Sequence, residues 1–163
     1  MNYSKKEVVA WVGEHFEEML AATLLAGMAI LAMVNVVTRY FIQLPLAFTE
    51  ELEVNGMVWL TLLGAAAAFR KGKHLRLHFF VQKLPPILQR LVDLLICILA
   101  VLLFCWLGYL GWLQLADEKL LEITSESLGY PQWIYTLAIP CGSALVVFRI
   151  IQAEWRLRSG GRR

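Results

Sequence analysis

The chain has 163 residues; 59% of them are hydrophobic, 17% are charged, and the mean hydropathy is +0.61. Soluble domains carry about 45–50% apolar and about 25% charged residues, so this composition argues against a soluble enzyme fold and is typical of a protein embedded in lipid. The net charge of +2 is too small to indicate a nucleic-acid partner. Three cysteines without a CxxC motif argue against a disulfide framework and against a zinc ribbon.

Four apolar stretches are long enough to cross a hydrocarbon core about 30 Å thick, which takes about 20 helical residues. They predict an all-α membrane protein that forms a single domain over 1–163, with transmembrane helices over about 19–38, 50–69, 90–115 and 132–152. Thr49 is the expected N-cap of the second helix, because Glu50 and Glu51 would then lie at the positive end of the helix dipole. Pro140 is expected to bend the fourth helix, because proline removes a backbone donor.

The segments at the two ends of the chain carry many charges. The lead, 1–18, has apolar residues at helical spacing between charged ones, which predicts an amphipathic helix that lies on the membrane or continues into the first span. The acidic residues in this lead and the long apolar run after it favour a retained span over a cleaved signal peptide. The tail, 153–163, is basic and is expected to be cytoplasmic.

Basic residues indicate which side of the membrane each loop occupies. Thirteen of the fifteen Lys and Arg residues fall in the lead, in the loop between the second and third spans, or from the end of the fourth span into the tail. Only Arg39 and Lys119 fall on the other side, which is rich in Asp and Glu. Both termini are therefore predicted to be cytoplasmic, and the outer surface is predicted to be acidic.

Polar residues inside a membrane usually have partners or a function. The predicted depths give three level sets, which are Asn35 with Asn55, Arg39 with Glu50 and Glu51, and Asp93 with Arg149. Hydrogen bonds of this kind contribute on the order of 1 kcal/mol in membranes. We expect these pairs to hold helices together rather than to form a transport site.

The middle of each predicted span is almost entirely apolar, whereas an ion-coupled carrier that works alone needs a charged or unwound site near the midplane. This favours a supporting role, with a small stand-alone carrier as the alternative. A third hypothesis is a haem- or quinone-binding anchor, but haem ligands would lie inside the spans, and His15, His74 and His78 lie at their edges. We expect no catalytic residue and no metal site. Small residues such as Gly27 and Gly64 would let another helix approach closely.

The basic loop that begins at Arg70 is the most distinctive polar segment. It has two interpretations, which are a simple positive-inside anchor and a surface that binds lipid headgroups or a partner.

Three segments of the chain share the order and spacing of a known family. The first runs from Arg39-Tyr40 through Pro45 to Glu50-Glu51, the second places Gly64 before Arg70-x-Gly72-x-His74, and the third joins Gly129-x-Pro131 to an Ile-Pro step at Pro140. The chain resembles the small membrane subunit of TRAP transporters, the tripartite ATP-independent periplasmic transporters (DctQ-like family), over about residues 15 to 155. Gln43, Phe48 and His78 differ from the residues that are common in the family.

The resemblance implies a non-catalytic subunit of the bacterial inner membrane that supports a large DctM-like membrane subunit. That partner would carry the substrate and the coupling sodium ions, so no cofactor is expected in this chain. A periplasmic DctP-like binding protein would deliver an organic acid such as a dicarboxylate or a sialic acid. The acidic outer surface would then be a candidate docking face for the binding protein, formed by Asp117, Glu118, Glu122 and Glu126.

Overall fold

The computed structural model describes the backbone of residues 5–43, 46–70 and 85–160, and the side chains of 15–43, 46–70, 85, 87–89 and 91–155. Within these ranges the chain is helical and has one isolated β-bridge, between Thr124 and Pro131. The elements in chain order are α1 (Lys5–Val37), a π-helical turn η1 (Thr38–Ile42), α2 (Ala47–Arg70), α4 (Pro86–Leu120), α5 (Trp133–Thr136) and α6 (Ala138–Gly160). The predicted all-α fold is confirmed.

Four helical segments are long and apolar enough to cross a membrane, which confirms the predicted number of spans. These segments are His15–Ile42, Ala47–Arg70, Ile87–Leu120 and Trp133–Trp155. The first helix begins well before the predicted span, because the charged lead continues into it as one helix. The segments Ala47–Arg70 and Ile87–Leu120 also extend beyond the predicted spans at both ends.

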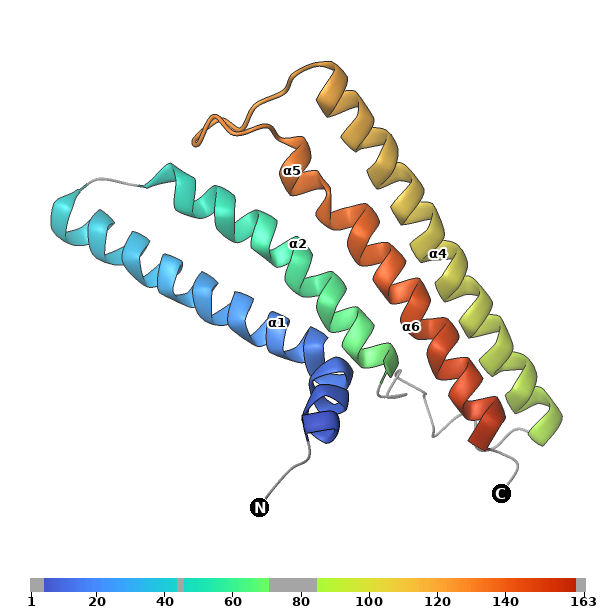
Figure 1. The fold of residues 1–163 in the computed structure, drawn as a ribbon. Helices are drawn as coiled ribbons and strands as arrows, with labels where there is room; N and C mark the ends of the chain where they lie inside the picture. The colour runs from blue at the N-terminus through green and yellow to red at the C-terminus, as the bar shows by residue number, and fades with distance from the viewer. Residues whose placement is uncertain (1–4, 44–45, 71–84, 161–163) are drawn as a thin grey trace.

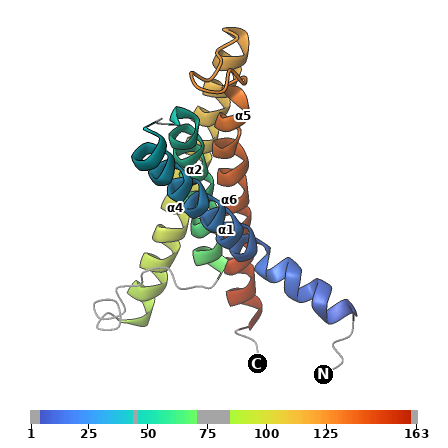
Figure 2. The same ribbon diagram turned by 90° about the vertical axis from the view of Figure 1, so that its left-hand side faces the viewer.

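The helices lie side by side in the order α1, α2, α6, α4 (Figure 1). The start of α1 and the end of α6 lie at the same end of the molecule, which we call the termini end. The opposite end carries η1 and the loop 121–132, and we call it the loop end. In the view turned by 90°, α1 crosses the other helices at an angle (Figure 2).

The small core lies between α2, α6 and α4. Ala66 and Phe69 of α2 and Val146 and Ile150 of α6 are buried, and α4 covers them with partly buried residues that include Phe104. The rings of Phe69 and Phe104 meet edge to face, with centroids 6.0 Å apart. This arrangement of two aromatic rings is favourable beyond the area that it buries.

Glycines bring α6 close to both of its neighbours. A Cβ added at Gly142 would lie 2.6 Å from Leu62 Cδ1, and one added at Gly111 would lie 2.6 Å from Ile139 Cγ2. Real side chains do not tolerate such distances, so these two positions need glycine for packing. Gly64, by contrast, has nothing within 4 Å of an added Cβ, and its face of α2 is open.

Two local expectations can be compared with the helix ends. Thr49 is not the N-cap: α2 begins at Ala47, and the Thr49 hydroxyl is buried and donates to the Leu46 carbonyl at 2.6 Å. The prediction was wrong because the helix starts earlier in the chain than the pair of glutamates suggested. A break in the fourth span separates α5 from α6 at Leu137, three residues before Pro140, as the missing proline donor would favour.

Most of the apolar surface faces outward. The most hydrophobic windows of α1 and α4 contain no buried residue, whereas 28% and 33% of the windows of α2 and α6 are buried. The accessible surface is 12491 Å², against about 8,200 Å² for a compact soluble protein of this mass. This surface requires lipid or another protein to cover it.

Candidate functional site

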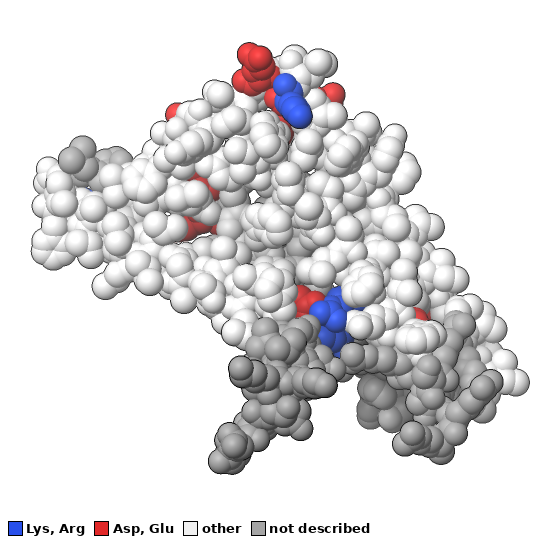
Figure 3. Space-filling model, viewed as in Figure 1, with Lys and Arg blue, Asp and Glu red and all other residues white. Residues whose placement is uncertain are grey.

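An ion-pair cluster joins three helices at the termini end. Glu17 of α1 accepts a hydrogen bond from Arg149 Nε of α6, and its other carboxylate oxygen lies 3.9 Å from Arg70 Nε of α2. Arg70 also donates to Glu18 of α1. Figure 3 shows basic and acidic atoms together at this junction. We call Glu17, Glu18, Arg70 and Arg149 the termini-end cluster; it pairs two carboxylates with two guanidinium groups.

The cluster is largely withdrawn from the surface. Glu17 is fully buried, and the side chains of Arg70 and Arg149 are 8% and 11% exposed. Charges buried in this way are tolerated only when they are paired, and loss of one partner is costly because it strands the other charge. The position of these residues therefore depends on all three helices being in place.

The sequence predicts Asp93 as the partner of Arg149, and the structure gives Glu17 in its place. Arg149 donates to Glu17 and also to Gln152, one turn further along α6. Asp93 is partly buried in α4, on the other side of α6, and has an interaction of its own. The depth estimate could not distinguish these partners, because Glu17 and Asp93 both lie near the same end of their spans.

At the loop end, Glu118 joins α4 to α5. It is 6% exposed, and it accepts hydrogen bonds from Gln114 Nε2 at 3.0 Å and from Thr136 Oγ1 at 2.6 Å. The neighbouring Lys119 ammonium lies 5.8 Å from the centre of the Trp133 ring, a cation–π contact between the same two elements. Glu118 is thus part of the fold, and its place in the predicted docking face was wrong.

The loop 121–132 folds back on itself and rests on α2. Ser125 N donates to the Tyr130 carbonyl at 2.8 Å, and Gly129 adopts a φ of 65°, which favours glycine. Ser127 N donates to Glu51 Oε2 at 3.2 Å, so Glu51 fastens the loop to the start of α2. This contact gives a structural role to Glu51, one of the two glutamates in the first family motif.

A polar hollow of about 470 Å³ lies beneath this loop. Its lining residues, which define the loop-end hollow, are Glu51, Glu118, Ile123, Thr124, Glu126, Ser127 and Gln132. The other members of the predicted docking face, Asp117, Glu122 and Glu126, are exposed. Acidic atoms are visible at the loop end in Figure 3. The structure therefore leaves three of the four predicted docking residues accessible.

The expected pair Asn35–Asn55 does not form. Asn55 donates to the Glu51 carbonyl of its own helix at 2.9 Å, and Asn35 Oδ1 is buried without a hydrogen-bond partner in the described part of the chain. Gly56 faces Met28 across the antiparallel pair α1 and α2, so Asn35 is level with about residue 49. That register separates the two asparagines by about 9 Å along the helix axis.

The first family motif also differs from the expectation. Arg39 is exposed in η1, and it makes no ion pair with any residue in the described ranges, so its pairing with Glu50 or Glu51 is not formed. Tyr40 beside it is 77% exposed. Pro131 ends the loop at the bridge to Thr124. Pro45, Gly72 and His74 lie outside the described residues.

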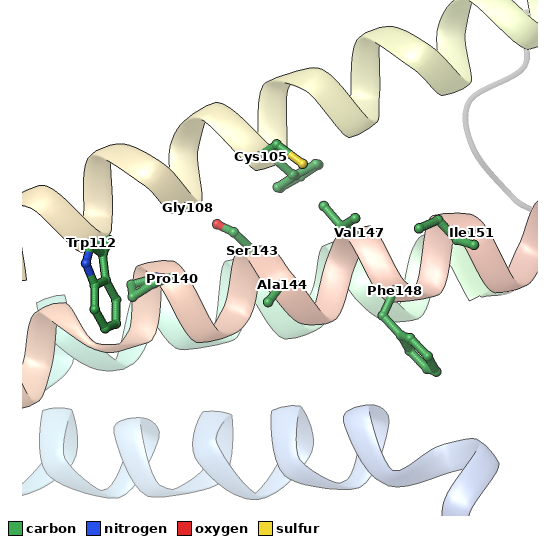
Figure 4. Close-up of a pocket in the computed structure, with 10 residues that line it drawn as sticks. Cys105, Gly108, Trp112, Pro140, Ser143, Ala144, Val147, Phe148 and Ile151 are labelled. Carbon is green, nitrogen blue, oxygen red and sulfur yellow. The ribbon is translucent and has the colours of Figure 1, made fainter.

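An apolar groove of about 520 Å³ runs between α4 and α6 (Figure 4). Gly108 and Ser143 meet at its floor, while Trp112 and Phe148 are more than half exposed along it. The Ser143 hydroxyl is buried without a hydrogen-bond partner in the described residues. The groove has the apolar character of a contact surface for a lipid chain or a helix.

The described residues contain no group of three His, Cys, Asp or Glu side chains that could hold a metal ion. The cysteines Cys97, Cys105 and Cys141 lie on the spans and form no disulfide, and Cys97 packs against the core. His15 lies near the termini end of α1.

Comparison with known proteins agrees with the resemblance. Residues 28–160 match the family model of the DctQ component of tripartite ATP-independent periplasmic transporters. A Haemophilus influenzae protein whose name assigns it to the TRAP transporter small permeases is 33% identical over 82% of this chain and 84% of its own length. The C4-dicarboxylate TRAP transporter small permease DctQ of Vibrio cholerae is 25% identical over 90% of this chain and 73% of its own length.

A longer relative contains the same segment within one chain. The sialic acid TRAP transporter permease SiaT of Haemophilus influenzae is 25% identical over 85% of this chain, which corresponds to 22% of that protein. The family model matches residues 28–160, which include most of the four spans, and the first relative matches 82% of this chain. The chain therefore belongs to the DctQ family, the small permease subunits of TRAP transporters.

Proposed function

We propose that this chain is a non-catalytic subunit that supports the large DctM-like membrane subunit during uptake of an organic acid. Uptake would be coupled to sodium and would depend on a periplasmic DctP-like binding protein. The chain would lie in the bacterial inner membrane with both termini in the cytoplasm, as its basic residues favour.

The observation that carries this proposal is the placement of charge. The segments 19–38, 54–69, 94–116 and 133–148 contain no Asp, Glu, Lys, Arg or His. A carrier needs polar groups near the membrane midplane to replace the water around its substrate and its coupling ion. A subunit that only supports a carrier has no such need.

The exposed surface supports a large partner. Among the described residues, exposed apolar side chains cover much of α1 from Phe16 onward and of α4 from Ile87 to Leu113, and the α4–α6 groove offers a contact surface beside them. In the Haemophilus SiaT protein the matching segment is about one fifth of a longer permease. Within TRAP permeases, a segment of this kind thus occurs joined to a much larger one.

The substrate is proposed only as a chemical class. The names of the relatives specify C4-dicarboxylates and sialic acid, and both are carboxylates. We propose that the carboxylate and the sodium ions bind in the large subunit and that this chain holds no cofactor. The exposed Asp117, Glu122 and Glu126 would receive the binding protein on the outer face.

Reconstitution into sealed lipid vesicles tests this function. Vesicles would hold this chain alone, the large subunit alone, or both, with binding protein loaded with labelled carboxylate outside and an inward sodium gradient. We expect uptake only when both subunits and the binding protein are present, and none when potassium replaces sodium. Uptake by this chain alone would establish the stand-alone carrier instead, and a Soret absorption band in the purified chain would establish the haem anchor.

A further inference from the structure

The single described buried residue of α1 is a charged one. Over residues 15–37, whose side chains are described, only Glu17 is buried, and it is 0% exposed. The remaining side chains of this stretch are partly or fully exposed. The helix is therefore attached to the molecule at one end through a carboxylate, and along its length by partial apolar contacts.

Those apolar contacts have little power to select one position for α1. Lipid chains solvate an apolar helix face about as well as another helix does, so there is no hydrophobic force that drives α1 onto α2. Between α1 and α2, the contact at a glycine is that of Gly56 with Met28, a long and flexible side chain. Several rotations and tilts of α1 against α2 would preserve contacts of this quality.

The contacts of Glu17 are different, because they are directional. Its carboxylate accepts a hydrogen bond from Arg149 Nε of α6, and its other oxygen lies 3.9 Å from Arg70 Nε of α2, an ion pair without a hydrogen bond. Glu17 thus contacts a charge on each of two helices. The adjacent Glu18, whose side chain is 32% exposed, binds Arg70 from α1 as well. Charge-assisted hydrogen bonds between side chains that are withdrawn from the surface are strong and specify geometry.

We propose that the contacts of Glu17 with Arg149 and Arg70, which we call the clasp, set the position of α1 against α2 and α6. When these contacts are lost, α1 remains helical but takes up a range of positions relative to the other helices. This proposal rests on the contacts within the chain and is independent of the transport function. In this proposal, one buried carboxylate determines the angle of α1 relative to α2 and α6, and therefore the direction in which the long apolar face of α1 points.

Distance measurements between spin labels on the full chain in lipid nanodiscs test the proposal. All samples carry Cys97→Ala, Cys105→Ala and Cys141→Ala. One label pair, Val36→Cys and Leu113→Cys, reports α1 relative to α4 at the loop end, far from the clasp. A second pair, Val54→Cys and Leu113→Cys, reports α2 relative to α4. The three labelled positions are exposed, so the labels do not disturb the core.

In the parent protein, both pairs should give one narrow distance distribution. With Glu17→Gln, the α1–α4 distribution should lose its narrow peak, while the α2–α4 distribution stays as it was. Glu18→Gln is the matched control. It should retain more of the narrow α1–α4 peak, because the Glu18 side chain is 32% exposed whereas that of Glu17 is 1% exposed. If Glu17→Gln does not fold, Glu17→Asp carries the same expectation, since it keeps the charge but shortens the reach.

Two results would overturn the proposal. One is an unchanged α1–α4 distribution in the Glu17 variant, which would show that apolar packing alone positions α1. The other is equal broadening of both label pairs, which would show that Glu17 supports the whole bundle rather than α1 in particular.

Discussion

The inner helices α2 and α6 differ from the outer helices α1 and α4 in what holds them. The inner pair buries close to a third of its most hydrophobic residues and contacts its neighbours through glycines. The most hydrophobic windows of the outer pair are more apolar than those of the inner pair, yet no residue within these windows is buried. Hydropathy alone thus identifies a span. It does not show whether the surface of that span is buried within the chain or exposed to lipid and other proteins.

The largest effect is expected where a glycine separates the two inner helices. Gly142→Val would place its Cβ 2.6–2.7 Å from two Leu62 atoms, and overpacking of this kind costs about 3 kcal/mol. The free energy of unfolding, measured by denaturant titration in mixed micelles, should fall by that amount. Gly64→Val is the matched control on the open face of α2, and its loss should stay below about 1 kcal/mol. Equal decreases in the free energy of unfolding for the two variants would show that close packing at Gly142 does not contribute to stability.

A smaller loss is expected at the hydrogen bond between Glu118 of α4 and Thr136 of α5. Glu118→Ala leaves Gln114 and Thr136 without their acceptor, and hydrogen bonds to charged groups contribute about 2 kcal/mol. Unfolding measured in the same way should show this loss. Asp117→Asn, an exposed neighbour on the same turn, should leave the unfolding midpoint in place. A stable Glu118→Ala variant would mean that the packing of α4 on α6 suffices.

Charge reversal at the exposed acidic residues of the loop end should weaken binding of the binding protein and leave the fold unchanged. The triple variant Asp117→Lys, Glu122→Lys and Glu126→Lys should raise the binding-protein concentration for half-maximal uptake about tenfold in the reconstituted transporter, which corresponds to about 1.4 kcal/mol. Added salt should weaken coupling in the parent protein more than in the variant, because it screens exposed charges. An unchanged concentration dependence would show that the binding protein docks elsewhere.

The smallest effect is expected at Arg39. Its position in the family motif suggests an ion pair, but the structure leaves it exposed and unpaired within the described ranges. Arg39→Ala should therefore leave the unfolding midpoint of the isolated chain unchanged. A clear destabilisation of the isolated chain would restore the pairing with Glu50 or Glu51. A loss seen only in the yield of the complex would place Arg39 at a surface for the partner.

The sequence predicts the four helices well, because a long apolar run has few alternatives to a helix inside lipid. It predicts contacts poorly. The expected pairing of Asn35 with Asn55 assumed that the two spans start level, but the contact of Met28 with Gly56 shifts the register by about six residues. Nothing in the sequence distinguishes Gly142, which must be small, from Gly64, which lies open.

The termini-end cluster was missed for a related reason. Glu17 and Glu18 stand just before an apolar run, where acidic residues are usually solvated, and their spacing carries no mark of burial. One signal in the sequence could have indicated the cluster. Arg70 is the last residue of the second span and Arg149 lies near the end of the fourth, so both are on the same side, and buried arginines need acidic partners. The exposure of most acidic residues at the loop end could be predicted from their charge. The burial of Glu118 could not, because it depends on a hydrogen bond from Thr136, which lies 18 residues further along the chain.

The length of α4 has a consequence for where the molecule ends. Its apolar segment, Ile87–Leu120, has 34 residues and measures about 51 Å. A bilayer with its headgroups is about 40–45 Å thick, so even at an average tilt of about 20° the helix emerges from it by a few ångströms. The excess length lies outside the bilayer at one end of α4 or at both, and the loop 121–132 follows directly on one of these ends.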